Sequence, residues 1–269
     1  ASYCTYALPT HGLISNCGKA HLEGFGGVEG VKKGKGELYD HLRQYNGTAF
    51  VMWDYDYLRE MSKGISNIIT YGTAAADIEG HALKTATFLE VAVTKGAATG
   101  NIKTQLVGDY NLPNVLAAIA VGKYFGVPDE KIKKALEEYT PSNSRSQLLQ
   151  KGSNSIILDA YNANPSSMKL AIENFAAINA EKKILLLGAM AELGAESLAE
   201  HQSIVDLLKK YNWTQVVLVG GDFLQLTHPF VSLPNALAAK EWLKAANPEN
   251  SQLLIKGSRS MKMETVLED

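Results

Sequence analysis

The sequence predicts an α/β protein of two domains, a mixed sheet with helices followed by a small doubly wound domain. Three observations lead to this prediction. Short apolar segments alternate with amphipathic ones along most of the chain, which is typical of parallel sheets covered by helices. Between Ile78 and Val107 this alternation stops, and the segment is rich in Thr, Val and Gly, which favours antiparallel strands. The polar segment Thr140–Gln147 has no large apolar residue and is the expected linker.

The first domain is expected to begin with alternating strands and helices. The apolar patterns predict strands at 12–16, 48–53 and 67–72, and helices at 28–45 and 55–63. After the antiparallel region, two more helices are expected at 111–125 and 128–139. Pro128 suits the first turn of the second one, where acidic residues also follow.

The second domain is expected to contain four βα units. The predicted strands are 155–159, 183–187, 215–220 and 252–257, and the predicted helices are 166–178, 198–211, 235–246 and a closing helix from 260. This number of units in about 120 residues is typical of a small doubly wound domain. We therefore expect a boundary between residues 1–143 and 144–269.

Composition excludes several classes of protein. The 26 basic and 28 acidic residues give a net charge of −2, whereas nucleic-acid-binding proteins usually have a basic excess. Cys4 and Cys17 are too few for a disulfide framework. The apolar runs are shorter than the roughly 20 residues that span a bilayer, and no signal-peptide pattern is present. We expect a cytoplasmic protein without membrane insertion.

The loops after the predicted strands carry most of the reactive side chains. In a doubly wound sheet, ligands bind beyond the carboxyl ends of the strands. The loop "DAYNANPSSM" places Asp159, Tyr161, Asn162 and Asn164 there. Helix capping by Ser166 after the rigid Pro165 accounts for only part of this loop, so binding is the favoured interpretation.

Two other loops allow both a structural and a binding role. Glu192 and His201 follow the strand "ILLLG", but both can simply lie on the next helix. Lys256 and Arg259 lie in "KGSRSMKME", where a helix N-terminus and two cations would hold a carboxylate or phosphate. A solvated charged segment is the alternative for this pair.

The sequence contains no complete nucleotide-binding motif of the two common kinds. "GFGGVEG" at 24–30 invites a dinucleotide-binding interpretation, but it has Glu29 in place of the third glycine and no strand directly before it. The phosphate loop G-x-x-x-x-G-K-[ST] is absent from the sequence. A nicotinamide-dependent oxidoreductase is therefore kept only as a minor alternative.

Several segments together resemble the Mur ligase family. They occur in the family's order and cover nearly the whole chain: "LISNCGKAHLEGFG", "KGKGELYDHL", "GDYNLPNVLAAIAVG", "SRSQ", "DAYNANPSSM", "GAMAELGAES" and "LLIKGSRSMKME". "AYNANPSSM" followed by "MAELG" favours the branch that adds D-alanyl-D-alanine to UDP-N-acetylmuramoyl-tripeptide. The resemblance implies an ATP- and Mg²⁺-dependent amide-bond ligase of peptidoglycan synthesis that proceeds through an acyl phosphate.

The resemblance also implies roles for individual residues. His21 would help to hold a magnesium ion, and Lys35 would do so if carbamylated, with Lys33 as the second choice. The ATP-binding residues would be Asn111, Asn114, Arg145, Asp159, Tyr161 and Asn162. Those near the peptide substrates would be Asn164, Glu192, His201, Lys256 and Arg259.

The chain also departs from the family pattern. The N-terminal domain, the phosphate loop and an acidic magnesium ligand have no counterpart in it, and Tyr110 replaces a common His. The resemblance therefore implies the C-terminal part of the central ATPase domain followed by a Rossmann-like C-terminal domain. We expect a monomeric fragment that is inactive by itself. A non-catalytic module that binds nucleotide or dipeptide is the main alternative.

Overall fold

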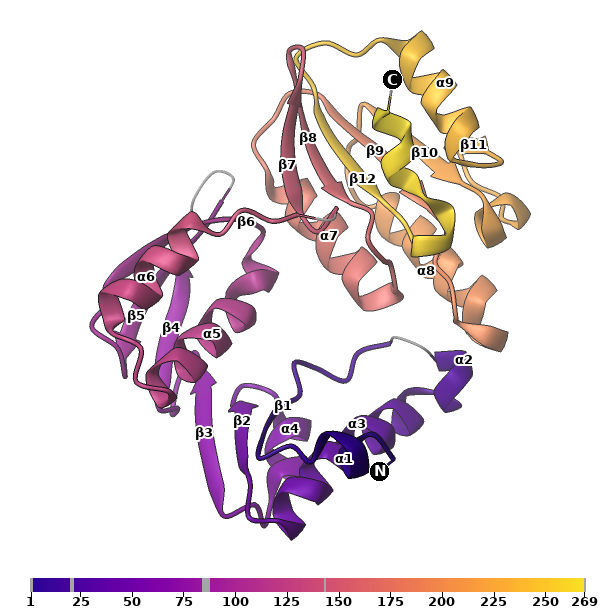
Figure 1. The fold of residues 1–269 in the computed structure, drawn as a ribbon. Helices are drawn as coiled ribbons and strands as arrows, with labels where there is room; N and C mark the ends of the chain where they lie inside the picture. Colours follow the sequence, from indigo (N-terminus) through magenta and orange to yellow (C-terminus); the bar gives the residue numbers. More distant parts are fainter. Residues whose placement is uncertain (1, 20–21, 84–87, 143, 269) are drawn as a thin grey trace. The chain divides into compact units, whose positions relative to one another are not determined.

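The computed structural model describes residues 2–19, 22–83, 88–142 and 144–268, which form two compact units (Figure 1). Unit 1 takes its residues from Ala1–Gly18, Phe25–Gln105 and Asp109–Tyr139. Unit 2 takes its residues from Lys19–Gly24, Leu106–Gly108 and Thr140–Asp269. Both units are layered α/β structures built on a six-stranded sheet, which confirms the predicted fold class.

The sheet of unit 1 is mixed, and its strands lie in sequence order. They are β1 (His11–Leu13), β2 (Thr48–Met52), β3 (Asn67–Gly72), β4 (Ile78–Leu83), β5 (Phe88–Lys95) and β6 (Asn101–Val107). Strands β1 to β4 are parallel, and β5 pairs antiparallel with β4. The loss of helical periodicity after Ile78 therefore marks the change from parallel to antiparallel pairing.

Helices cover both faces of this sheet. They are α3 (Val28–Gln44), α4 (Asp56–Ser62), α5 (Leu112–Tyr124) and α6 (Asp129–Glu138). Helix α5 packs across β2, β3 and β4, and α3 and α4 contact β2 as well. Every residue of β2 is buried, as expected of a parallel strand covered on both sides. The short helices α1 (Ser2–Ala7) and α2 (Leu22–Phe25) were not predicted.

The sheet of unit 2 has the strand order β11-β10-β9-β12-β8-β7. Its strands are β7 (Gln147–Lys151), β8 (Asn154–Asp159), β9 (Lys183–Gly188), β10 (Gln215–Val219), β11 (Val231–Leu233) and β12 (Gln252–Lys256). All are parallel except β7, which forms an antiparallel edge with β8. Strand β7, whose first residue lies in the predicted linker, and the short β11 were not predicted.

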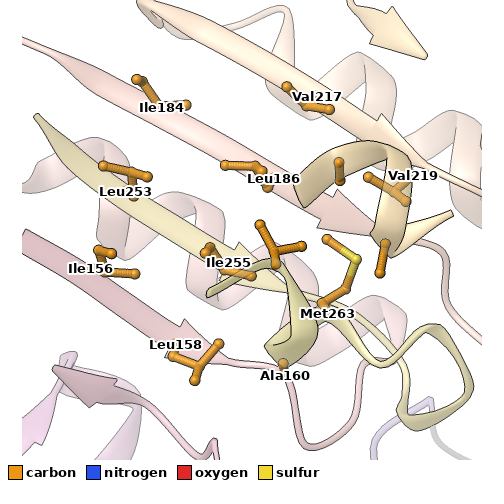
Figure 2. Packing of buried hydrophobic residues seen from close by; sticks show 13 residues of the cluster. Ile156, Leu158, Ala160, Ile184, Leu186, Val217, Val219, Leu253, Ile255 and Met263 are labelled. Atoms are coloured by element: carbon orange, nitrogen blue, oxygen red, sulfur yellow. The ribbon is translucent and has the colours of Figure 1, made fainter. Parts of the chain in front are cut away.

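Unit 2 has the three layers of a doubly wound domain. Helices α7 (Pro165–Ala177) and α8 (Ser197–Leu208) pack together, as do α9 (Ala236–Ala246) and the 3₁₀ helix η5 (Met263–Leu267). Figure 2 shows Leu186 and Ile255 in one apolar cluster with Met263 of η5. The neighbouring Leu185 and Leu254 are equally buried, and their side chains point to the opposite face because successive strand residues alternate.

The predicted closing helix from residue 260 is wrong. The segment instead forms two short 3₁₀ helices, η4 (Arg259–Met261) and η5. Lys262 separates them with a left-handed backbone, φ +48°. A left-handed residue ends a right-handed helix, so no α-helix forms here.

The order of the strands brings three strand ends together. Strand β12 lies between β9 and β8, while β10 and β11 extend away from β9 on the other side. Strands β8 and β9 lead into α7 and α8, which pack together, whereas β12 leads into η5, which packs with α9. A strand end between such diverging connections is the position where ligands bind in open α/β sheets. Within the part of the chain that is described, no helix is long and apolar enough to span a bilayer.

Two glycines allow the ends of β9 and β12 to approach closely. A Cβ atom on Gly257 would lie 2.6 Å from Cγ of the buried Met263 and 3.1 Å from Cα of Gly188. We predict that Gly257→Ala lowers the free energy of unfolding by about 1–3 kcal/mol, because overpacking forces the surroundings to shift. Urea denaturation with Gly24→Ala as control checks this, since no atom lies within 4 Å of a Cβ on helical Gly24. Equal stability of both variants would contradict the prediction.

Candidate functional site

A buried ion pair joins the carboxyl ends of β8 and β12. Asp159 and Lys256 are register partners at the last positions of these strands. Lys256 Nζ lies 2.5 Å from Asp159 Oδ2 and also donates to the Asn162 carbonyl at 3.2 Å. Only 2% of the Lys256 side chain is exposed, against 15% for Asp159. The ammonium therefore points into the protein, and the predicted direct contact between Lys256 and a substrate is not supported by this position.

The predicted linker is partly fixed to the loop after β8. The other carboxylate oxygen of Asp159, Oδ1, accepts a hydrogen bond from the Ser146 N–H at 3.0 Å. The Tyr161 N–H donates to the Ser144 carbonyl at 3.1 Å. The Arg145 guanidinium lies over the Tyr161 ring, 3.5 Å from its centroid, in a cation–π contact. The structure thus brings together Arg145, Asp159 and Tyr161, all three predicted to bind ATP.

Asn164 begins α7 as its N-cap residue. Its Oδ1 accepts from the Ser167 N–H at 2.9 Å, and the Ser167 hydroxyl accepts from the Asn164 N–H at 3.1 Å. This reciprocal pair is a capping box, so Asn164 and not Ser166 caps the helix. The neighbouring Asn162 is exposed, and its Oδ1 accepts from the Ala163 N–H.

His201 is completely buried in unit 2 and holds the loop after β9. Its Nδ1–H donates to the Ser197 carbonyl at 2.7 Å, and its Nε2 accepts from the Met190 N–H at 3.0 Å. This pattern requires a neutral imidazole. Burial lowers the pKa of His201, although the Ser197 carbonyl, Asp222 and Glu200 oppose the shift. With both nitrogens used in this way, His201 orients a loop, and the expectation of a direct substrate contact is not supported.

The remaining predicted residues of unit 2 lie on the surface. Glu192 is exposed, with a left-handed backbone at φ +61°. Arg259 is two-thirds exposed and pairs with Glu264 at 3.0 Å. Because Arg259 begins a three-residue 3₁₀ helix, the expected helix N-terminus at this point does not exist. Sequence reasoning missed the buried Ser258, whose hydroxyl donates to the Ala189 carbonyl at 2.6 Å and ties the ends of β12 and β9 together.

Lys35 is the best placed of the predicted residues in unit 1. It lies on α3, and its Nζ donates to the Asn16 carbonyl at 2.6 Å, whereas Lys33 is exposed. Burial raises the pKa of the neighbouring Cys17 thiol, and Lys35 and Lys32 oppose this shift. His21 lies outside the described residues. Within those residues, no group of three or more His, Cys, Asp or Glu side chains could hold a metal ion.

Two carboxamides lie side by side where α5 begins. Asn111 is buried and Asn114 is exposed, and Nδ2 of Asn114 donates to Oδ1 of Asn111 at 3.2 Å. Such a pair presents both donors and acceptors, as hydrogen bonding to a nucleobase edge requires. An open cavity of about 580 Å³ lies elsewhere in unit 1, at the start of α6, and contains none of the predicted residues.

The glycine-rich segment 24–30 lacks the geometry of a dinucleotide-binding loop. It consists of the end of α2, a turn through Gly26 and Gly27, and the first residues of α3. Both turn glycines have a positive φ, which explains why glycine is required there. Because no strand leads directly into this turn, the motif is a helix–helix connection.

Two families of known domains match the chain. The Mur ligase middle domain matches residues 2–122, and the domain described as Mur ligase, glutamate ligase domain matches residues 144–259. The similar proteins include the UDP-N-acetylmuramoyl-tripeptide–D-alanyl-D-alanine ligases of Haemophilus influenzae and Escherichia coli, each 32% identical over 96% of this chain. The chain spans 58% and 59%, respectively, of the length of these two relatives.

Solved structures show the same similarity. MurF from Acinetobacter baumannii has a TM-score of 0.82 and 27% identity, over 96% of this chain and 59% of that one. The MurF ligase from Thermotoga maritima in complex with ADP has a TM-score of 0.86 over 99% of this chain and 62% of that one. Its identity of 23% supports the fold alone.

The buried neutral His201 predicts a pH-dependent stability. The unfolded chain binds a proton at this residue below pH about 6.5, while the lowered pKa keeps the folded form neutral to lower pH. The stability that neutral His201 contributes is therefore fully present above about pH 6.5 and is lost as the pH falls below that value. We predict that His201→Gln is about 1–3 kcal/mol less stable at neutral pH, because its buried partners lose their hydrogen bonds.

Urea denaturation between about pH 7.5 and pH 5 checks this prediction. Wild type should lose stability more steeply than His201→Gln as the pH falls. His81→Gln is the control, since His81 is exposed on β4, and it should behave like wild type. Parallel curves for wild type and His201→Gln would refute the assignment.

Proposed function

The chain belongs to the Mur ligase family, and from this membership we propose that its parent protein is the ligase that joins D-alanyl-D-alanine to UDP-N-acetylmuramoyl-tripeptide. One observation carries the proposal: ligases named for this activity align with 96% of the chain. The chain spans less than two thirds of those relatives, so the activity is proposed for the whole protein and not for this portion by itself.

We propose that residues 1–143 form the C-terminal part of the central ATP-binding domain and that 144–269 form the C-terminal domain. In unit 1 we propose that Asn111 and Asn114 bind ATP, and in unit 2 we propose this role for Arg145, Asp159, Tyr161 and Asn162. The carboxamide pair and the cation–π pair support this placement, because they offer hydrogen bonds to a base and positive charge to phosphates. Asn164 and Glu192 remain proposals for the dipeptide side, and Arg259 for an anionic substrate group.

Magnesium is proposed at Lys35 and His21. An ammonium cannot bind Mg²⁺, but a carbamate formed on Lys35 Nζ would offer the oxygen ligands that this ion prefers. The carbonyl of Asn16, within hydrogen-bond distance of Nζ, adds an oxygen at the same place and supports the fit. Bound there, the ion would neutralise charge on the γ-phosphate.

The proposed reaction joins a carboxylate to an amine. A carboxylate oxygen of the tripeptide attacks the γ-phosphorus of ATP, ADP leaves, and an acyl phosphate forms. The free amine of D-alanyl-D-alanine then attacks the acyl carbon, releases phosphate and loses a proton. Both reactants of the first step are anions, so the contribution expected from Arg145 is electrostatic. The proposed substrates include ATP and a nucleotide-linked peptide, so we place the reaction in the cytoplasm. The expectation of a monomer stays a prediction.

The assay of the whole parent protein is phosphate release that requires ATP, UDP-N-acetylmuramoyl-tripeptide and D-alanyl-D-alanine together. No release under any of these conditions would favour the non-catalytic binding module, and release that needs only ATP would contradict the proposed ligase. We predict that Lys35→Ala in that protein lowers kcat by about 100-fold or more, since it removes a group that stabilises transition-state charge. Lys33→Ala is the matched control on the same helix and should stay near wild type. Equal effects of the two variants on kcat would contradict the placement of Lys35 at the metal site.

A second prediction separates capping from substrate binding at Asn164. Asn164→Ala and Asn235→Ala both remove an N-cap side chain, from α7 and α9 respectively, and each should cost about 0.5–2 kcal/mol of stability. Only Asn164→Ala should raise the KM for D-alanyl-D-alanine, and by more than the KM for ATP. Steady-state kinetics and thermal melting of both variants provide the measurement. If the KM for the dipeptide is the same in both variants, Asn164 caps α7 and does not bind the dipeptide.

A further inference from the structure

We propose that Lys256 is a positioning residue whose buried ammonium neutralises Asp159 and thereby leaves the Arg145 guanidinium, stacked on Tyr161, to face an anionic ligand. This inference rests on the proposed function for the identity of the ligand, a nucleotide phosphate. It assigns to Lys256 a role within unit 2 that differs from direct substrate contact.

The position of Lys256 excludes a direct role at the surface. It is the last residue of β12, a strand with neighbours on both sides, and its side chain is 98% buried. Its Nζ is occupied by Asp159 Oδ2 at 2.5 Å and by the Asn162 carbonyl at 3.2 Å. A buried cation requires such a counterion, so the pair acts as a neutral unit.

The second oxygen of Asp159 links this pair to Arg145. It accepts from the N–H of Ser146, while the Ser144 carbonyl accepts from the N–H of Tyr161. Ser144 and Ser146 both have left-handed backbones, at φ +56° and +48°. Residues other than glycine rarely adopt this backbone conformation, and it persists only where the surrounding structure holds it. The residue between them, Arg145, is therefore fixed from both sides by the loop 159–161.

The charges explain why the counterion has to be Lys256. Across the described ranges, Arg145 forms no ion pair, although it directly precedes a residue bound to Asp159. Without Lys256, the Asp159 carboxylate would lack its counterion and would attract the nearest cation. Arg145 suits that role, because guanidinium and carboxylate form strong paired hydrogen bonds. Loss of Lys256 would thus move Arg145 from Tyr161 to Asp159.

The test is NMR of the complete 269-residue chain with labelled arginine. The Arg145 side-chain resonances are assigned by their loss in Arg145→Lys, and their ring-current shift is defined by comparison with Tyr161→Leu. We expect Lys256→Met to lose most of this shift. The double variant Lys256→Met/Asp159→Asn should regain it, because the carboxylate that attracts Arg145 is gone. Lys256→Arg keeps the charge and should keep the shift.

A role in stability alone would give a different pattern. Lys256→Met would then melt at a lower temperature but keep the Arg145 shift, and that result would overturn the proposal. Failure of the double variant to regain the shift would overturn it as well. If Lys256→Met does not fold, Lys256→Gln, which can still donate to the Asn162 carbonyl, carries the same predictions. In the whole parent protein, a titration with ADP that leaves the Arg145 resonances unmoved would count against the proposed nucleotide site, independently of the positioning result.

Discussion

A buried charge requires a counterion in direct contact with it. In unit 2, Lys256 and Asp159 form such a pair at the ends of two adjacent strands. Removing one member of a buried pair typically costs about 3–5 kcal/mol, because the other charge is left without a partner. The pair therefore constrains everything attached to it: the Asn162 carbonyl, the Ser146 amide and, next to that amide, Arg145. The geometry of the candidate site depends on this one interaction.

Sheet topology puts the pair where ligands bind. Strand β12 inserts between β8 and β9, so three carboxyl ends meet where the connections to the two helical pairs diverge. Gly188 and Gly257 allow the ends of β9 and β12 to approach, and Ser258 bonds to the Ala189 carbonyl across them. His201 fixes the next residue, Met190, through its amide. The loops that carry the polar groups are thus anchored to rigid strands, and sites held in this way keep their geometry.

The sequence predicted those features that depend on local pattern. Alternating apolar segments predicted most of the helices and strands, because burial of one face imposes a period on the chain. Strand β7 was missed, because its residues follow directly on a polar stretch that reads as linker, and β11 because it has only three residues. The predicted closing helix was wrong because Lys262 has a left-handed backbone. A single sequence carries no reliable signal for that conformation. The polar residues after β8 were identified, but their roles were not: Lys256 meets Asp159 across 97 positions, and only the fold shows that the cation is buried.

The most direct test is a crystal structure of the parent protein with bound ADP. We predict that the Arg145 guanidinium hydrogen-bonds a phosphate oxygen of the nucleotide, while Lys256 stays paired with Asp159 and buried. An ADP molecule bound away from Arg145 and Tyr161, or an Arg145 paired with Asp159 in that complex, would contradict it.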